Sequence, residues 1–322
     1  MMKYLKLRSG SDELEFSKVI VGSTMSMAGM DEKDVFRIYD EYAALGGNSI
    51  DTARAYNNYQ AEGMVARWLQ TRQDRDRFVI TTKGGQPKEE TPEIGRIDRA
   101  SLEEDLNASL KALGTDHIDL YWIHKDDESH PAEDVIDSLN SFKKAGKIRV
   151  FGCSNWSVER IRQANEYAQA NGLEGFSASQ IQWSMVRTQI PEYFLTNFGS
   201  VCMDELQYRW YLENHVPVFS FSSQAQGFLP RLDALGKEGM PQDLMEQYGS
   251  EQSFQILDRV KEYAAKHGTT IPAVALAYLL NNKLPCAALI GADSVERLRE
   301  SLEALKVDMS AEDADRLFYG EH

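Results

Sequence analysis

The sequence predicts a closed (β/α)8 TIM barrel, an α/β fold, and three observations support that fold class. Eight short runs rich in β-branched and aromatic residues recur along the chain, each followed by a longer segment of helical period. Parallel strands need a helix-sized connection, so this alternation predicts parallel pairing. No G-x-G-x-x-G turn follows an early strand, as a doubly wound sheet would normally require. A length of 322 residues, 42% of them hydrophobic, suits a single barrel domain over residues 1–322.

The expected hairpin and barrel strands can be assigned in chain order. The segment 3–17 predicts an N-terminal β-hairpin at the bottom of the barrel. The barrel strands are expected at 18–22, 48–52, 77–83, 117–124, 148–155, 175–180, 216–223 and 286–292.

The helices between the strands show an apolar stripe and a stop signal. Val35, Ile38, Tyr39 and Tyr42 share one stripe that ends at Gly46-Gly47. A less well marked helix is expected near 61–70. The same pattern repeats in a later segment with Leu102, Leu106, Leu110 and Leu113 on the stripe and Gly114 as the stop, and again in a segment that starts at Pro131 and stops at Gly146.

Further segments do not fit the eight repeats. Residues 184–200 and 224–250 form connections longer than ordinary βα loops, and we expect them to be flaps at the active-site face. Additional helices are expected at 272–282 and 310–318 near the C-terminus.

Composition narrows the classes of partner. Lys and Arg number 35 and Asp and Glu 50, which gives a net charge of −15, so nucleic acid and anionic membranes are not expected partners. The three cysteines are widely spaced and form no metal-ligand pattern, so neither a disulfide framework nor a metal site is expected. No signal-peptide or membrane-spanning stretch occurs, which favours a cytoplasmic protein, expected to be a monomer or a small homo-oligomer.

Polar residues stand at nearly every predicted strand exit, where barrels carry their chemistry. The second, third and fourth strands end in Asp51, Lys83 and His124. The next three end in the groups Ser154-Asn155, Ser179-Gln180 and Phe221-Ser222-Ser223. Taken singly, each has a plain structural explanation, such as a cap, a solvated strand end or a satisfied core histidine. The barrel brings them around one mouth, which favours a functional interpretation.

The residue types suggest protonation of an oxygen. Asp51 can pair with Lys83, and the Lys83 ammonium near Tyr56 is expected to lower the tyrosine pKa from its ordinary value of about 10. A phenol tuned in this way can deliver a proton, while His124 can donate a hydrogen bond to a carbonyl oxygen. These groups supply no electrons, so the hydride must come from a cofactor. Side chains at Ser154, Asn155 and Gln180 can bond a carboxamide, and Phe221 can stack on its ring.

The sequence resembles the aldo-keto reductase superfamily over essentially the whole chain, with motifs in the same order. The matching pieces are GGNSIDTARAY, VITTKGG, SLEEDLNASLKALGTDHIDLYWIH, GKIRVFGCSNW, ASQIQWS and SVERLRESLEAL. The resemblance implies a catalytic tetrad of Asp51, Tyr56, Lys83 and His124, with Tyr56 as the proton donor.

The resemblance also implies how a nicotinamide dinucleotide is held. The nicotinamide contacts fall on Ser154, Asn155, Gln180 and Phe221, the pyrophosphate contacts on Ser222, Gln224 and Gly227, and the adenosine contacts on Arg297 and Glu300. Gly291 stands where members that grip a 2′-phosphate place a lysine. Arg297 favours NADP(H), and NAD(H) remains the alternative.

The substrate is expected to be a small carbonyl or sugar-like molecule, held by aromatic walls at Trp156, Trp183 and Tyr193. The implied activity is reduction of aldehydes or ketones, reversible as alcohol oxidation. Two other functions stay open at this point: a nicotinamide-binding sensor of partner proteins with little turnover, and a Schiff-base lyase that uses Lys83.

Overall fold

The structure is a computed structural model that describes residues 1–24 and 29–320. The strands are β1 (Tyr4–Ser9), β2 (Asp12–Ser17), β3 (Val19–Gly22), β4 (Ser49–Asp51), β5 (Val79–Gly84), β6 (Ile118–Ile123), β7 (Ile148–Ser154), β8 (Ser179–Gln182), β9 (Val218–Phe221) and β10 (Cys286–Ile290). The helices are α1 (Glu32–Ala44), α2 (Ala61–Gln70), α3 (Arg99–Leu113), α4 (Ala132–Lys144), α5 (Val158–Ala170), α6 (Pro191–Phe198), α7 (Glu205–Glu213), α8 (Phe228–Gly239), α9 (Gln242–Tyr248), α10 (Glu251–His267), α11 (Ile271–Leu280), α12 (Val295–Leu302) and α13 (Ala311–Tyr319).

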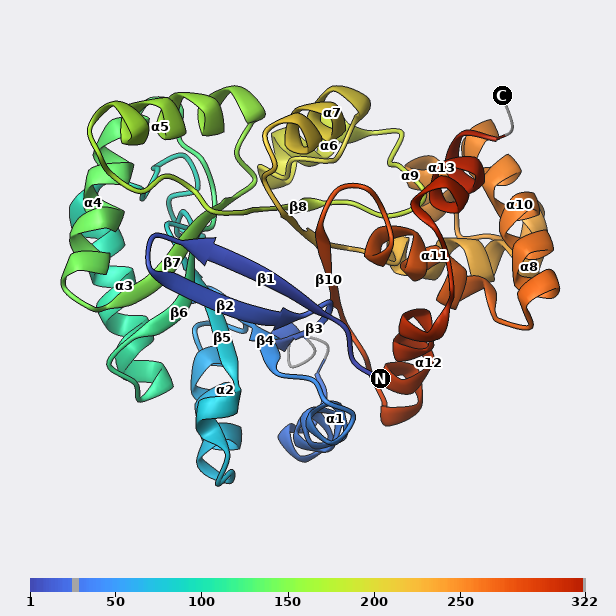
Figure 1. The fold of residues 1–322 in the computed structure, drawn as a ribbon, viewed down its shortest axis with the longest axis horizontal. Helices are drawn as coiled ribbons and strands as arrows, with labels where there is room; N and C mark the ends of the chain where they lie inside the picture. The colour runs from blue at the N-terminus through green and yellow to red at the C-terminus, as the bar shows by residue number, and fades with distance from the viewer. Residues whose placement is uncertain (25–28, 321–322) are drawn as a thin grey trace.

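Eight strands of the described chain form a closed parallel barrel, which confirms the predicted fold class. Their order around the barrel is β10-β3-β4-β5-β6-β7-β8-β9 (Figure 1). The first barrel strand therefore pairs with the last, with Val19 opposite Ala288. The register also places Asp51 opposite Thr81 and Lys83 opposite Trp122. The strand ends thus meet at one face, as the site prediction requires.

The barrel has two apolar layers because its strands are buried on both sides. All six residues of β6 are buried, which explains why this strand shows a continuous apolar run instead of an alternating pattern. Inside the barrel, Trp122 packs against Phe219 with ring centroids 5.1 Å apart. A larger core lies between the strands and the surrounding helices.

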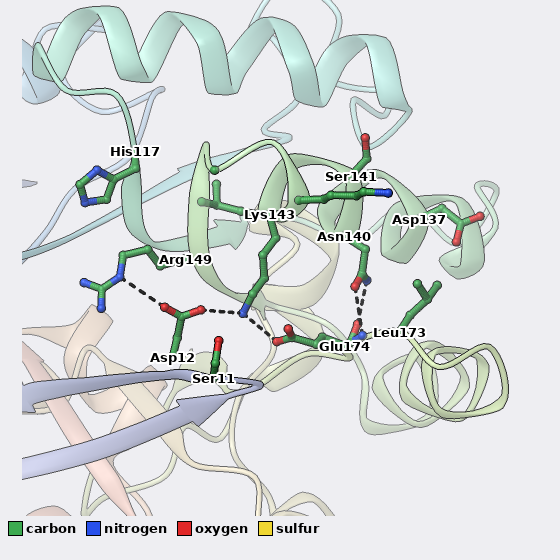
Figure 2. Close-up of a pocket in the computed structure, with 13 residues that line it drawn as sticks. Ser11, Asp12, His117, Asp137, Asn140, Ser141, Lys143, Arg149, Leu173 and Glu174 are labelled. Atoms are coloured by element: carbon green, nitrogen blue, oxygen red, sulfur yellow. Dashed lines mark hydrogen bonds and ion pairs between the residues drawn. The ribbon is translucent and has the colours of Figure 1, made fainter.

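The hairpin β1–β2 lies across one end of the barrel, as predicted (Figure 1). Its apolar residues join the interior cluster, and Phe16 contacts Phe219 at 5.1 Å between ring centroids. Ion pairs fix its turn to the helical layer, since Asp12 lies between Lys143, at 3.2 Å, and Arg149, at 3.6 Å (Figure 2). Lys143 also reaches Glu174 at 2.8 Å. The hairpin therefore closes the end of the barrel opposite to the strand exits.

The predicted helices begin and end where local signals place them. The side chain of Asp98 accepts hydrogen bonds from the backbone N–H groups of Ala100 and Ser101 and caps α3. Gly114 ends the same helix in the left-handed conformation, at φ 66°. In the described part of the chain, no helix combines the length and apolar character needed to cross a membrane.

Some boundaries differ from the predictions. The sequence predicts the sixth barrel strand at 175–180, but β8 runs from Ser179 to Gln182, so Gln180 lies near its start and not at its exit. The two long connections are partly helical: α6 lies within 184–200, and α8 and α9 lie within 224–250. The supernumerary helices expected at 272–282 and 310–318 correspond to α11 and α13.

Candidate active site

A buried ion pair joins the exits of β4 and β5. The Lys83 Nζ donates to Asp51 Oδ2 at 2.5 Å and to the carbonyl oxygen of Thr52 at 2.8 Å. Lys83 is 1% exposed and Asp51 3% exposed. Burial lowers the pKa of Lys83, but the Asp51 carboxylate and the interaction with Tyr56 raise it, and the net pKa lies above its ordinary value. Lys83 is therefore an ammonium at neutral pH.

The Asp51 carboxylate is held by neutral donors as well. Its Oδ1 accepts hydrogen bonds from Thr81 Oγ1 at 2.6 Å and from Gln180 Nε2 at 3.1 Å. These donors fix the orientation of the carboxylate, so that its other oxygen faces Lys83. A charge removed from water in this way is tolerated because both carboxylate oxygens accept hydrogen bonds and one faces the Lys83 ammonium.

Tyr56 lies on the turn between β4 and α2, next to the ion pair. The Lys83 Nζ is 4.8 Å from the centroid of the Tyr56 ring. Directly after Tyr56, residues Asn57, Asn58 and Tyr59 all have positive φ, at 51°, 49° and 66°. Asparagine tolerates this left-handed region, whereas tyrosine rarely adopts it. The Arg54 guanidinium stabilises the turn by donating to the carbonyl oxygen of Tyr59 at 3.3 Å.

The pKa of Tyr56 corrects one expectation from the sequence. Burial raises the pKa of the Tyr56 phenol, the Lys83 ammonium lowers it, and the net pKa lies above the ordinary value. Lys83 thus acts in the predicted direction, but the predicted net decrease is wrong because burial outweighs it. The phenol is therefore protonated at neutral pH.

His124 faces Tyr56 across the mouth, with ring centroids 5.6 Å apart in an edge-on arrangement. Burial together with the nearby Lys83 and Lys125 ammonium groups holds the pKa of His124 well below its ordinary range. The imidazole is therefore neutral. A neutral imidazole can donate one hydrogen bond to a carbonyl oxygen without adding a second acid to the site.

The residues at the exit of β7 form the floor beside His124. Asn155 Nδ2 donates to the carbonyl oxygen of His124 at 3.2 Å and to Ser154 Oγ at 3.0 Å. Asn155 Oδ1 accepts from the backbone N–H of Val201 at 3.1 Å. Ser154 Oγ donates to the carbonyl oxygen of Gln180 at 2.9 Å. Both ends of the Asn155 amide are thus already bonded within the protein.

One continuous cavity of about 1170 Å³ begins at these residues. Asp51, Tyr56 and His124 line it, and Lys83 is buried against Asp51. The predicted cofactor-binding residues all line the same cavity: Ser154, Asn155, Gln180, Phe221, Ser222, Gln224, Gly227, Arg297 and Glu300. The cavity therefore connects the β4–β6 exits with α12. Its row of amide, hydroxyl, aromatic and cationic groups fits an extended dinucleotide.

The loop after β9 has an unusual backbone. Ser222, Ala225 and Gln226 have φ values of 50°, 46° and 54°, and Gly227 follows at 74° before α8 begins. Two N–H groups of this loop are bonded within it: Ala225 donates to the carbonyl oxygen of Ser222 at 2.9 Å, and Gly227 donates to that of Gln224 at 2.8 Å. The side chain of Gln224 donates to Ser301 Oγ at 3.1 Å and so joins this loop to α12.

The aromatic walls predicted for the substrate are elsewhere. Trp156 is completely buried and packs on Phe176 at 5.0 Å between ring centroids, and Trp183 is 1% exposed and packs on Tyr208 and Tyr278. Neither lines the cavity, because both side chains point into the layer between barrel and helices. Tyr193 is 51% exposed on α6 and does not line the cavity either. The apolar part of the wall comes instead from residues such as Met30, Met185 and Val186.

Two kinds of site residue escaped the sequence analysis. Thr81 donates a hydrogen bond to Asp51. The sequence could have indicated this residue, because Thr81 stands two positions before Lys83 and residues two apart on a strand share a face. Arg231 lines the cavity too, and no pattern in the sequence distinguishes it from an ordinary surface charge. Lys125, which the sequence offers either as a substrate contact or as a solvated loop charge, also lines the cavity.

Comparisons with known proteins agree with this geometry. Residues 18–318 match the model of the Aldo/keto reductase family. The chain is 28% identical to aldo-keto reductase ausK of Aspergillus calidoustus, with 93% of this chain and 76% of the relative covered. It is 28% identical to norsolorinic acid reductase of Aspergillus flavus, with 97% and 80% covered, and 25% identical to a probable aryl-alcohol dehydrogenase of Saccharomyces cerevisiae, with 90% and 88% covered.

A solved structure supports the fold. A thermostable aldo-keto reductase crystallised with the inhibitor epalrestat superposes with a TM-score of 0.72 at 22% identity, covering 99% of this chain and all of that one. The family match extends over nearly the whole barrel, and the relatives are named as reductases and dehydrogenases. This oxidoreductase chain belongs to the aldo/keto reductase family.

Proposed function

We propose that the protein is an NAD(P)H-dependent reductase of aldehydes and ketones, reversible as an alcohol dehydrogenase. The observation that carries this proposal is a protonated phenol beside a buried ammonium at the mouth of a dinucleotide-sized cavity. A reduced nicotinamide bound there would supply the hydride.

In this mechanism, His124 orients the carbonyl oxygen by donating a hydrogen bond from its neutral ring. Tyr56 transfers its phenolic proton to that oxygen as negative charge develops on it. Lys83 stabilises the resulting phenolate, since its ammonium lies over the same ring. Asp51 keeps Lys83 charged and in place.

Of the predicted carboxamide contacts Ser154, Asn155 and Gln180, Gln180 is the favoured one, because the amide of Asn155 is bonded at both ends within the protein. Gln180 uses its amide nitrogen on Asp51, which leaves its amide oxygen to accept from a carboxamide. Phe221 would stack on the ring. Arg297, paired only weakly with Asp293 at 4.0 Å, would contact a 2′-phosphate, so NADP(H) is the favoured cofactor and NAD(H) the alternative. Fluorescence titration with NADPH and NADH would rank the two.

The charge state of Lys83 speaks against Schiff-base chemistry. A lysine nucleophile must lose its proton, whereas Asp51 holds this one as an ammonium. Borohydride reduction in the presence of a carbonyl compound should therefore trap no covalent adduct. A sensor without turnover would not need the proton donor, and oxidation of bound NADPH by a generic aldehyde in a single turnover would exclude that role.

The test of the proposal is Tyr56→Phe. The variant keeps the ring and loses the proton, so turnover should fall by roughly 100- to 10,000-fold while cofactor affinity stays within about twofold. Turnover comparable to that of the unmodified enzyme would refute Tyr56 as the proton donor.

A further inference from the structure

Lys125 follows His124 directly at the exit of β6 and lines the same cavity. Its Nζ donates to the carbonyl oxygens of Phe198 and Gly199, the latter at 3.0 Å, and to Ser200 Oγ at 3.5 Å. All three acceptors are uncharged and belong to the last turn of α6 or follow it. Lys125 therefore ties this helix to the mouth of the barrel, but its own charge is not neutralised.

The charged groups around Lys125 on its own segment do not compensate it. His124 is neutral, because burial lowers its pKa and the Lys83 and Lys125 ammonium groups lower it further. Asp126 is paired with Arg160 at 3.1 Å. Among residues 1–24 and 29–320, no carboxylate forms an ion pair with Lys125.

The facing elements leave the charge uncompensated as well. The acidic residue of α6, Glu192, lies in its first turn, at the opposite end from the carbonyls that Lys125 contacts. Asp51 is already paired with Lys83. Burial lowers the pKa of Lys125 to about 8, which is the direction expected for an ammonium without a counter-ion.

We propose that Lys125 selects carbonyl substrates that carry an anionic group on an apolar body. This inference rests on the proposed reductase function and names the substrate class of that site. The apolar body fits a wall that contains Met30, Met185 and Val186. The anion fits the ammonium of Lys125, which follows His124 in the chain and lines the same cavity.

An incoming carboxylate would take over the weakest existing bond. The Ser200 contact, at 3.5 Å, is the longest of the three, and a charge-assisted bond to a carboxylate is shorter and stronger. The two bonds to the backbone carbonyls can remain, so α6 keeps its anchor while substrate binds. The same lysine thus positions the flap helix and recognises the substrate.

The experiment compares two substrates that differ by one charge, para-formylbenzoate and its methyl ester. In the unmodified enzyme we expect kcat/KM to favour the carboxylate. Lys125→Met should reduce this preference on the order of ten- to a hundredfold, mainly through KM, and Lys125→Arg should keep most of it. Lys144→Met is the matched control, because it removes the same charge from an exposed position on α4; it should leave the preference unchanged.

The pH dependence gives an independent signature. As pH rises through about 8, the ammonium loses its proton, so KM for the carboxylate should rise while KM for the ester stays constant. If Lys125→Met lowers activity equally for both substrates, Lys125 acts only as the anchor of α6 and the proposal fails. An unchanged preference in that variant overturns it too.

A binding measurement separates this proposal from the proposed function. Calorimetric titration with para-hydroxymethylbenzoate and with its methyl ester needs no turnover. If no carbonyl compound is reduced, the reductase proposal fails, but weaker binding of the carboxylate to Lys125→Met would still support the anion site. If carbonyl compounds are reduced and the two ligands bind equally well to the unmodified protein, only the anion site is refuted.

Discussion

Asp51→Asn isolates the cost of leaving a buried ammonium without its counter-ion. The substitution keeps the size of the side chain and retains an acceptor for Thr81. It leaves Lys83 buried, 1% exposed, with the carbonyl oxygen of Thr52 as its remaining strong partner. Removing one member of a buried ion pair typically destabilises a protein by about 3–5 kcal/mol. With an unfolding entropy of roughly 2.1 cal/mol/K per residue, this corresponds to about 4–7 °C in Tm for a chain of 322 residues.

The assay is thermal and urea unfolding of the single variants and of the double variant Asp51→Asn with Lys83→Met. The double variant should be more stable than Asp51→Asn alone, because the uncompensated charge is gone. Glu303→Gln is the control: Lys306 and Glu303 are also close, at 2.6 Å, but their side chains are 65% and 48% exposed, so less than about 1 kcal/mol should be lost. Equal losses in Asp51→Asn and Glu303→Gln would refute the argument that burial decides the strength of the pair.

Three other outcomes follow from the site and its surroundings. Because the pKa of Tyr56 lies above its ordinary value near 10, the rate of carbonyl reduction should stay level across about pH 6–8 and fall only in alkaline solution; a decline centred on neutral pH in the kcat profile would contradict this. Burial raises the pKa of the Glu62 carboxyl, so the folded state binds its proton more tightly than the unfolded state and stability falls as pH rises through the folded pKa. Glu62→Gln should flatten that dependence, as measured by urea unfolding at two pH values, and an unchanged slope would count against it. Asn155→Ala should lose about 2–3 kcal/mol in thermal unfolding, because it removes the bonds to Val201 and His124 and holds alanine at φ 62°; Asn155→Gly should recover roughly 1 kcal/mol of this, and an equal loss in both would exclude backbone strain as a cause.

The fold and the core of the site could be predicted because they depend on periodicity. Asp51, Lys83 and His124 end strands whose apolar runs are clear in the sequence, and parallel strands bring their exits to one face. Tyr56 stands five residues after Asp51, on the turn that follows β4, so its position near the same mouth could be predicted too. These placements need no knowledge of side-chain orientation.

What could not be predicted depends on orientation and on burial. Trp156 and Trp183 follow strand exits, as the tetrad residues do, but they pack outward under the helices, and a strand exit does not reveal that choice. The net pKa of Tyr56 depends on how much burial opposes Lys83, which only three-dimensional packing determines. Lys125 bonds the carbonyl oxygens of Phe198 and Gly199, which lie more than 70 residues later in the chain, and only the folded structure shows that this segment returns to the barrel mouth.

The pairing of β3 with β10 has a consequence for synthesis on the ribosome. The first barrel strand has its partner at residues 286–290, and the backbone N–H of Ala288 bonds the carbonyl oxygen of Lys18 at 2.7 Å. The hairpin ahead of it packs on Ala287 and Leu289 as well as on earlier strands. Translation therefore delivers β3 long before β10, and part of the apolar face of the hairpin stays uncovered until β10 has been made.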